Sequence, residues 1–573
     1  MSNLPLAAYA PPFEADTYSS EDEQCISPFF TNLDKPVYVP LIFSPEIIGA
    51  LCSRTSRAAE DLRPIFLKEY IKPFLEDTSE YGEHLWEFIG FLHKHPIEQI
   101  FSNPRARSFY AKWLAQYGDD SIAQMSGMHV VYAGISQLAI KHFEDQRIGL
   151  APIEKSTRYV DFSKKINGSY MYYTDPTLKK MNLDKEYQLA MDTLFETYID
   201  LLPKLQAWLQ EKFSEEKPGV IEKKAFDTLR GLLPVATLSQ VAFFGNGQAF
   251  EYLISRSLKH PLGEVRWAAQ QTLDELSKVA PSFFRRLIDE ESRQTAEAYQ
   301  EYMAGRGRRM EQFIKNIRET GLPIEALSAD RQAWAEVGPA SKNVRLLEYD
   351  PAGQEKVITG MLYNAPSNHA SWEETLARVK AMDGSKKKKI ITAYLDGRTA
   401  RWQKVGRAFE NAYVRFEITM NIGAWRDLHR HRMLTQQRQH FTTAHSYDVA
   451  PELIESGLDK PFRAAIAKAE EAYEKISAKD KDLAQYAVTL AHRVRFQQWK
   501  NLRECFWEME LRTIPEGHPD YRHIEQEKFR LLENVYPLIT EHMHVNMGEY
   551  NFARRGQEEK IQEKLKSLER INV

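Results

Sequence analysis

One polar pattern occurs twice along this chain, once in each half. It consists of an asparagine, an arginine ten or eleven residues later, and then a His-Pro pair. The members are Asn246, Arg256 and His260-Pro261 in the first half, and Asn501, Arg512 and His518-Pro519 in the second. A segment that reads as a strand running into a helix precedes each copy. We interpret the pattern as a divergent tandem duplication that breaks near residues 320–340.

The periodicity of apolar residues predicts strands and helices in both halves. Residues 412–420 alternate as a half-buried strand does and lead through Gly423 into a helical stretch, and Met128–Tyr132 begins a similar unit. Helical spacing dominates 45–114 and 183–320, whereas residues 344–351 read as a short strand. We expect an α+β fold with an N-terminal arm over 1–44, a first repeat over 45–320 and a second repeat over 338–573.

Composition excludes several classes of protein. The chain has 573 residues and a net charge of −4, which does not suggest general nucleic-acid binding. Its three cysteines form no CxxC pair, so neither a disulfide framework nor a structural metal site is expected. The longest apolar run, 231–245, is too short for a membrane span, which needs roughly 20 apolar residues. Without a signal peptide or membrane segment, the expectation is a soluble, cytoplasmic protein.

Two of the three basic clusters have both a functional and an ordinary interpretation. Arg430-His431-Arg432 follows a predicted helix and either binds an anion or lies at an exposed helix end. The run 304–309 is interpreted as a solvated basic turn rather than a phosphate site, and Lys386–Lys389 as a solvated strand or loop edge.

A second candidate site lies in the first half. If the segment after Pro152 is extended, then Glu154, Ser156 and Arg158 project to the same side. Arginine with serine is a suitable set of phosphate ligands, although an ordinary half-exposed strand remains the alternative. Arg230 precedes an apolar run, where a buried arginine needs a ligand or a carboxylate as its partner.

Together these residues resemble the signature of the flavin-dependent thymidylate synthase family, RHRxxSxxExSxRY, divided between the halves. The second half keeps the beginning of the signature, in Arg430-His431-Arg432 with Thr435. The first half keeps its end, in Glu154, Ser156, Arg158 and Tyr159. The missing parts read Gln146-Arg147-Ile148 in the first half and Arg438, His440, Thr442 and Thr443 in the second.

Other motifs resemble the family too. Arg230 before Leu-Pro matches a substrate-binding arginine, and the second half has Gln485 at that place. Arg512 matches a late arginine that helps to ionise the uracil ring, with Arg256 as its counterpart shifted by one residue. Residues 118–121 are similar to the family's GHxS turn, whose histidine lies near the flavin, but Asp119 replaces that histidine. Residues 405–407 resemble the turn less closely, with Val405 at the histidine place.

The resemblance implies one composite site per chain. The nucleotide dUMP would be bound by Glu154, Ser156, Arg158, Tyr159, Arg230, Arg430 and Arg512, with Arg512 as the catalytic group. FAD would lie near Ser121, Glu154, Asn246, Arg430, His431, Arg432, Asn501 and Arg503. The reciprocal set is largely erased.

The resemblance also implies fold and function. The fold would be two tandem domains, each a small antiparallel sheet flanked by helices, forming a pseudo-dimer that assembles as a homodimer. The activity would be FAD-dependent methylation of dUMP to dTMP with methylenetetrahydrofolate and NADPH, without nucleic acid or membrane partners. The alternative is a flavin- and nucleotide-binding protein of this fold that has lost or changed the methylation.

Overall fold

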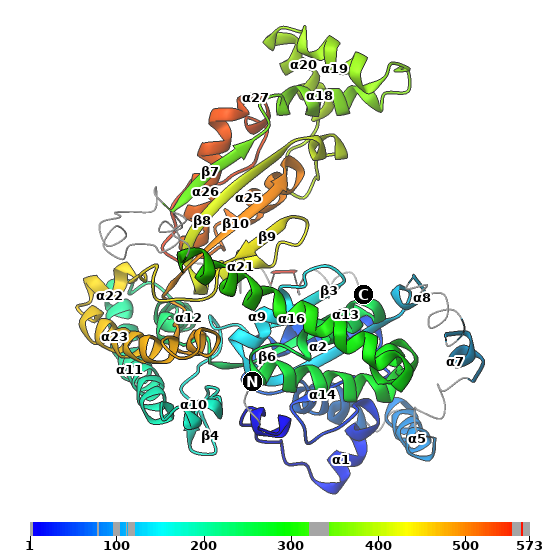
Figure 1. The fold of residues 1–573 in the computed structure, drawn as a ribbon, viewed down its shortest axis with the longest axis vertical. Helices are drawn as coiled ribbons and strands as arrows, with labels where there is room; N and C mark the ends of the chain where they lie inside the picture. The colour runs from blue at the N-terminus through cyan, green and yellow to red at the C-terminus, as the bar shows by residue number, and fades with distance from the viewer. Residues whose placement is uncertain are drawn as a thin grey trace. The chain divides into compact units, whose positions relative to one another are not determined.

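The computed structural model of the chain describes residues 4–76, 80–95, 104–110, 112, 121–319, 343–552, 563, 564 and 566 (Figure 1). The chain divides into two compact units. Unit 1 comprises Met1–Trp208, Ala225–Ser328 and Pro451–Thr489, and unit 2 comprises Leu209–Lys224, Ala329–Ala450 and Leu490–Val573. The units therefore do not coincide with the two halves of the sequence, because a segment of the second half, Pro451–Thr489, packs within unit 1.

Unit 1 contains a four-stranded antiparallel sheet in the order β1-β2-β6-β3. Its strands are β1 (Val37–Tyr38), β2 (Gly127–Ser136), β6 (Leu238–Asn246) and β3 (Leu150–Glu154). The helices α9 (Gln137–Glu144), α13 (Gly247–Ser257) and α14 (Gly263–Val279) pack against it. Buried aromatic rings join the layers, with the Tyr132 ring centroid 5.3 Å from that of Phe143 and 5.9 Å from that of Phe243.

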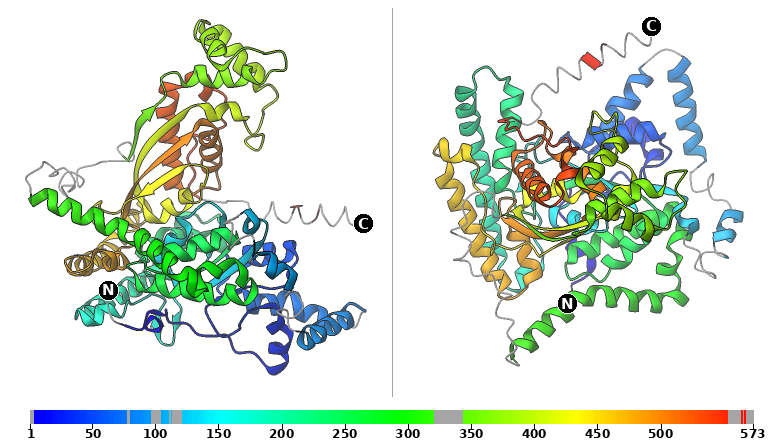
Figure 2. Two further views of the ribbon diagram at one scale, coloured as in Figure 1. Left: turned by 45° about the vertical axis from the view of Figure 1, so that its right-hand side comes forward. Right: turned by 90° about the horizontal axis from the view of Figure 1, so that it is seen from above.

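Unit 2 repeats this arrangement. Its antiparallel sheet has the order β7-β8-β10-β9, with β7 (Val344–Tyr349), β8 (Tyr413–Asn421), β10 (Arg493–Asn501) and β9 (Thr435–Arg438). The helices α21 (Ile422–His429), α25 (Leu502–Arg512) and α26 (Pro519–Val535) pack against it, as two further views show (Figure 2). The strands predicted over 344–351 and 412–420 are confirmed, and so is a fold of helices with small antiparallel sheets.

The strand registers align the two halves residue by residue. Glu154 pairs with Val241 on β6, and Arg438 pairs with Phe496 at the equivalent place on β10. Helix ends correct one predicted equivalence, because Asp145 caps α9 as Arg430 caps α21. Asp145, not Gln146, therefore holds the Arg430 place. The segment that follows is one residue longer in the first half (154 − 145 = 9; 438 − 430 = 8).

The remaining elements of the first half surround this framework. They are η1 (Leu6–Tyr9), α1 (Ser20–Ile26), η2 (Ser27–Phe29), α2 (Pro45–Thr55), α3 (Leu62–Phe66), the π-helical η3 (Leu67–Ile71), α4 (Lys72–Leu75), α5 (Glu80–Lys94), α7 (Pro104–Tyr110), α8 (Ser121–Gln124), β4 (Lys165–Ile166), β5 (Ser169–Tyr170), α10 (Thr177–Lys180), α11 (Asp184–Lys212), α12 (Pro218–Leu229), η5 (Arg230–Leu232), η6 (Pro281–Phe284), α15 (Arg285–Ile288) and α16 (Glu290–Glu319). Those of the second half are α18 (Gly353–Tyr363), α19 (Trp372–Lys380), α20 (Gly384–Tyr394), η9 (Arg407–Asn411), α22 (Pro451–Glu455), α23 (Asp459–Ser477), α24 (Lys481–Ala484), η10 (Gln485–Ala487) and α27 (Pro537–Thr540).

Several local expectations are wrong. The run 304–309 lies inside α16 rather than in a turn, and Lys386–Lys389 lies inside α20, whose first turn is capped by the Asp383 side chain. The apolar run 231–245 forms η5 and β6 instead of continuing the helices. Its residues 238–243 are all buried, and a central strand covered on both faces shows no alternation in its sequence.

The first 44 residues, expected to be an extended arm, contribute α1, β1 and part of a buried core. That core includes Ile26, Phe29 and Phe30 together with residues of α2 and α3. Within the described part of the chain, no helix combines the length and apolar character that crossing a bilayer requires.

Candidate functional site

The predicted residues fall into two sets, one in each unit. In unit 1, two predicted arginines meet at one carboxylate. Arg158 Nη2 lies 3.1 Å from Asp227 Oδ2, and Arg230 Nη1 lies 3.3 Å from Asp227 Oδ1. All three side chains are at most about one-tenth exposed, and Asp227 belongs to α12. The structure therefore brings Arg158 and Arg230 together at Asp227, an acidic partner that the sequence analysis did not identify.

The segment that carries Arg158 is a turn rather than a continued strand. Strand β3 ends at Glu154, and the Ser156 hydroxyl oxygen accepts a hydrogen bond of 3.2 Å from the Arg158 backbone N–H. The Ser156 N–H donates to the carbonyl oxygen of Ser56 at 2.9 Å. Strict alternation thus fails after Glu154, because the serine side chain stabilises a turn. Tyr159 lies in this turn and is half-buried.

Glu154 is buried and paired within unit 1. Lys141 Nζ on α9 donates to its carboxylate at 2.8 Å and to Glu144 at 2.6 Å. The side chains of all three residues are at most 3% exposed. A buried charge of this kind needs such a partner, so Glu154 also has a structural function at this edge of the sheet.

The repeated asparagines have the same local function in both halves. The Asn246 side-chain oxygen accepts from Ala249 N at 2.9 Å, and the Asn501 oxygen accepts from Glu504 N at 3.0 Å. Each therefore caps the N-terminus of its helix, α13 or α25, which explains why this residue type recurs there. Ser121 begins α8 and is exposed, whereas Gly118, Asp119 and Asp120 lie outside the described residues.

In unit 2, the two arginines of the triplet Arg430-His431-Arg432 are exposed and its histidine is buried. Arg430 and Arg432 are exposed, and Arg430 lies 3.8 Å from Asp427. Arg503 pairs with Glu410 of η9 at 2.6 Å. His431 is only 4% exposed. The ordinary interpretation of Arg430, an exposed residue at a helix end, fits its position, and that position leaves its guanidinium accessible to an anion.

His431 links the catalytic candidate Arg512 to Glu504. Arg512 Nε donates to His431 Nε2 at 3.0 Å, and His431 Nδ1 lies 2.8 Å from Glu504 Oε1. Burial, and then the charges of Arg512 and two buried lysines, hold the pKa of His431 well below its usual value. Because arginine only donates, Nε2 must accept, and the proton of the neutral ring lies on Nδ1.

A fully buried group of charges lies beside this link. Lys500 pairs with Glu508, and Lys528 Nζ lies 2.6 Å from Glu525 and 3.3 Å from Glu508. Gln498 accepts from both lysines, at 3.2 and 2.9 Å. Burial, followed by the charge of Lys528, lowers the pKa of Lys500 to about 7. We refer to Gln498, Lys500, Glu508, Glu525 and Lys528 as the buried charge cluster.

The first half has no such cluster at the equivalent positions that follow from the matched strands and helices. Phe243, Gly245 and Leu253 stand at the places of Gln498, Lys500 and Glu508. The sequence analysis missed the cluster. The available signal was the polar side chains of Gln498 and Lys500, which share one face of a strand that is otherwise expected to be buried.

A cavity of about 1030 Å³ in unit 1 occupies the first-half counterpart of the Arg430 region. It is lined by residues of α13 and α16 and by the segment after α9, including Gln146, Asn246, Gln248, Tyr252 and Tyr299. Gln248 and Tyr252 stand where α25 carries Arg503 and Trp507. The first half thus keeps a hollow at this place, with an uncharged side chain at the Arg503 position.

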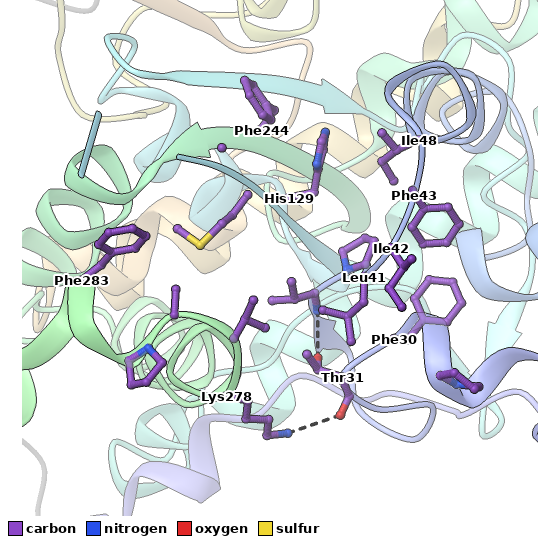
Figure 3. Close-up of a pocket in the computed structure, with 18 of the residues that line it drawn as sticks. Phe30, Thr31, Leu41, Ile42, Phe43, Ile48, His129, Phe244, Lys278 and Phe283 are labelled. Carbon is purple, nitrogen blue, oxygen red and sulfur yellow. Dashed lines mark hydrogen bonds between the residues drawn. The ribbon is translucent and has the colours of Figure 1, made fainter. Parts of the chain in front are cut away.

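A second cavity of unit 1, about 880 Å³, was not expected (Figure 3). Its wall is mostly apolar and includes residues of the N-terminal segment, the sheet, and the end of α14 with η6, and Phe30, Phe244 and Phe283 are among the labelled side chains. His129 and Lys278 add polar groups, and burial lowers the pKa of His129. Among the described residues, no group of three or more His, Cys, Asp or Glu side chains is arranged to hold a metal ion.

Comparison with known proteins gives consistent results for the whole chain. The family described as "Thymidylate synthase complementing protein" matches two segments, residues 81–282 and 345–538. A UPF0159 protein of Chlamydia muridarum is 33% identical over 94% of this chain and 98% of its own length. A UPF0159 protein of Thermoplasma acidophilum is 28% identical over 88% of this chain and 96% of its own length. A flavin-dependent thymidylate synthase of Mycobacterium marinum is 26% identical over 35% of this chain and 78% of its own length.

Proposed function

The chain belongs to the thymidylate synthase complementing protein family, and on this premise we propose that it methylates dUMP to dTMP in a flavin-dependent reaction. Methylenetetrahydrofolate and NADPH are the proposed co-substrates. The observation that carries the proposal is the complementary retention of the signature, since Arg158 and Arg230 persist in one half and Arg430 and Arg512 in the other.

A tandem duplication, with two segments matching one family, supports a pseudo-dimeric chain. The two sheets have the same strand order. Within unit 1, Pro234 and Thr489 form an isolated antiparallel bridge, and Val235 N–H donates to the Val488 carbonyl at 2.8 Å. Pro234 precedes Asn246 by the same interval by which Thr489 precedes Asn501, so this bridge joins equivalent residues, as a two-fold axis requires. We further propose that two chains form a homodimer.

Arg158 and Arg230 are the proposed phosphate ligands. The guanidiniums of Arg158 and Arg230 meet at the carboxylate of Asp227 in a largely buried place. A nucleotide phosphate can accept paired N–H bonds from such groups. Each charge-assisted bond contributes about 1.5–3 kcal/mol, so this pair accounts for a large share of nucleotide affinity.

The donor set of unit 2 fits a flavin dinucleotide. Arg430 and Arg432 expose guanidiniums suited to a diphosphate, and Trp507 is 36% exposed on the same helix as Arg503. The flavin, when bound, supplies the hydride that reduces the transferred one-carbon unit. His431 is buried with both ring nitrogens engaged, so its proposed contribution passes through Arg512 rather than through direct contact with a cofactor.

Arg512 is the proposed catalytic group. Its half-buried guanidinium is oriented before substrate arrives, because Nε is already bonded to His431. A preoriented cation stabilises negative charge that develops on the uracil ring, and removing one such group typically costs about 3 kcal/mol in the transition state.

One observation favours the alternative, a flavin- and nucleotide-binding protein that has lost or changed the methylation. Val405, which stands at the place of the family's flavin-proximal histidine in the second half, is apolar and 4% exposed. It cannot supply the hydrogen bonds of an imidazole.

Purified protein distinguishes the two functions. The methylating enzyme oxidises NADPH and forms dTMP when dUMP and methylenetetrahydrofolate are present. A binding protein changes its flavin absorption with dUMP but yields no dTMP. Protein that takes up neither flavin nor dUMP would refute both.

A further inference from the structure

We propose that Glu504 and His431 are positioning residues that set the orientation of Arg512 and make nucleotide binding depend on the charge of Glu504. The inference rests on the proposed function of Arg512 as a group that faces the nucleotide. It extends that function, because it assigns the control of Arg512 to two side chains that do not themselves touch the substrate.

The hydrogen bonds run in one direction along three side chains. Arg512 Nε donates to His431 Nε2 at 3.0 Å, and His431 Nδ1, 2.8 Å from Glu504 Oε1, donates to it. The ring can accept from arginine only while its proton is on Nδ1. An ionised Glu504 stabilises that tautomer, because a carboxylate accepts and cannot donate.

Protonation of Glu504 would disturb this order. A protonated carboxyl can donate to Nδ1, which moves the ring proton to Nε2. Nε2–H and the Arg512 Nε–H would then point at each other as two donors. The Arg512 guanidinium would lose its anchor, although His431 itself stays neutral throughout.

The surroundings place this change in an accessible pH range. Burial raises the pKa of Glu504 to about 7. The charged groups that act on Glu504 are Lys500 of β10, Lys528 and Glu525 of α26, and Arg512 of its own helix, and Asp427 of α21 acts on His431. Lys500, Lys528 and Arg512 lower the pKa of Glu504, but burial raises it by more.

The first half provides a matched control. Gln146 follows the cap of α9 as His431 follows the cap of α21, and its amide donates to the Ala249 carbonyl at 2.7 Å. Ala249 stands at the Glu504 place on α13, and Ser257 stands at the Arg512 place. The same local contact between a loop and a helix therefore occurs in this half without an ionisable acid or a substrate arginine.

The experiment measures dUMP affinity by calorimetry between pH 6 and pH 8.5 for the full chain and three variants. Glu504→Gln keeps an oxygen that accepts from His431 at every pH, His431→Leu removes the link, and Gln146→Ala is the control. We expect the affinity of the unmodified protein to fall by up to about ten-fold per pH unit below pH 7, beyond the change in Glu504→Gln, since one proton is coupled to binding. The nucleotide phosphate takes up its own proton at about pH 6, and its contribution to the pH dependence of binding is the same in all variants.

The variants separate the possible results. His431→Leu should bind about ten-fold more weakly at pH 8, where the link is intact in the unmodified protein. Gln146→Ala should retain the full pH dependence. An identical pH dependence in Glu504→Gln and the unmodified protein, with both binding dUMP, overturns the link alone. Failure of the unmodified protein to bind dUMP at every pH overturns the proposed function and this inference together. Melting temperatures establish that each variant is folded.

Discussion

Pro234 and Thr489 hold equivalent places in the two halves of the chain and face each other across an antiparallel β-bridge in unit 1. Four residues before each of these positions, the halves differ in charge, with Arg230 at the start of η5 and Gln485 at the start of η10. Equivalent backbone positions therefore pair here beside side chains that differ between the halves. This is the relationship expected when a duplicated enzyme keeps one working site and loses its reciprocal.

The arginine pair of unit 1 is expected to carry nucleotide affinity. Arg158→Ala and Arg230→Ala should each weaken dUMP binding by at least ten-fold, because each removes a charge-assisted bond worth about 1.5–3 kcal/mol. The matched controls, Thr442→Ala and Gln485→Ala, change the counterparts in the second half and should leave the affinity unchanged. Calorimetry on folded variants measures both. Full affinity after Arg158→Ala would contradict the assignment.

Flavin binding should depend on the exposed arginines of unit 2. Arg430→Ala combined with Arg432→Ala should raise the dissociation constant for FAD by more than ten-fold, since both guanidiniums are proposed to bind the diphosphate. Flavin absorbance at about 450 nm measures FAD binding during the titration. The exposed Arg463 of α23 is a suitable control, because its ion pair with Asp459 lies on a helix that is not proposed to bind the cofactor. Equal FAD affinity in the double variant and the Arg463→Ala control would refute this role.

Glu264 should make the stability of unit 1 depend on pH. Its carboxylate accepts from Ser136 and from Tyr486 at 2.6–2.8 Å, and burial raises its pKa to about 7. Because the folded-state pKa lies above the unfolded value, the stabilisation is present below pH 4.5 and is lost as the pH rises through 7. Glu264→Gln should remove up to about 3 kcal/mol of that dependence. Melting temperatures of the unmodified protein and the Glu264→Gln variant at pH 5.5 and pH 8 measure this dependence. Equal changes with pH in the two proteins would count against a contribution from Glu264.

The buried charge cluster should respond strongly to the loss of one partner. Glu508→Leu leaves Lys500 and Lys528 without a shared carboxylate in a fully buried place, which is expected to destabilise unit 2 by about 3–5 kcal/mol. Asp459→Asn breaks a partly exposed ion pair of α23 and should cost at most about 1 kcal/mol. Denaturant unfolding compares the two. A Glu508→Leu variant as stable as Asp459→Asn would show that the lysines find other compensation.

Strand β8 could be predicted from sequence because apolar and polar residues alternate along it, and β7 because Val344–Tyr349 forms a short run that ends before Pro351. The same alternation is absent from β6, whose residues 238–243 are all buried on both faces of the sheet. The family resemblance, which the family match confirms, depended on charged residues at fixed spacing rather than on the apolar core.

Partner residues contributed by distant elements could not be found in this way. Asp227 and Glu504 become meaningful only when folding brings them to Arg158 and His431, and an acidic residue on a helix has no distinctive local pattern. The turn after Glu154 was also missed, because Ser156 can either continue a strand or accept a backbone N–H, and the sequence does not decide between these.

The central claim is a single dUMP site per chain, formed by residues that the two halves retain in complementary fashion. Calorimetric titration of dUMP into the flavin-loaded protein tests it most directly. The account predicts one dUMP molecule bound per chain, with the affinity lowered about ten-fold or more by Arg158→Ala and by Arg512→Ala. Two equivalent dUMP molecules per chain, or full binding after either substitution, would contradict it.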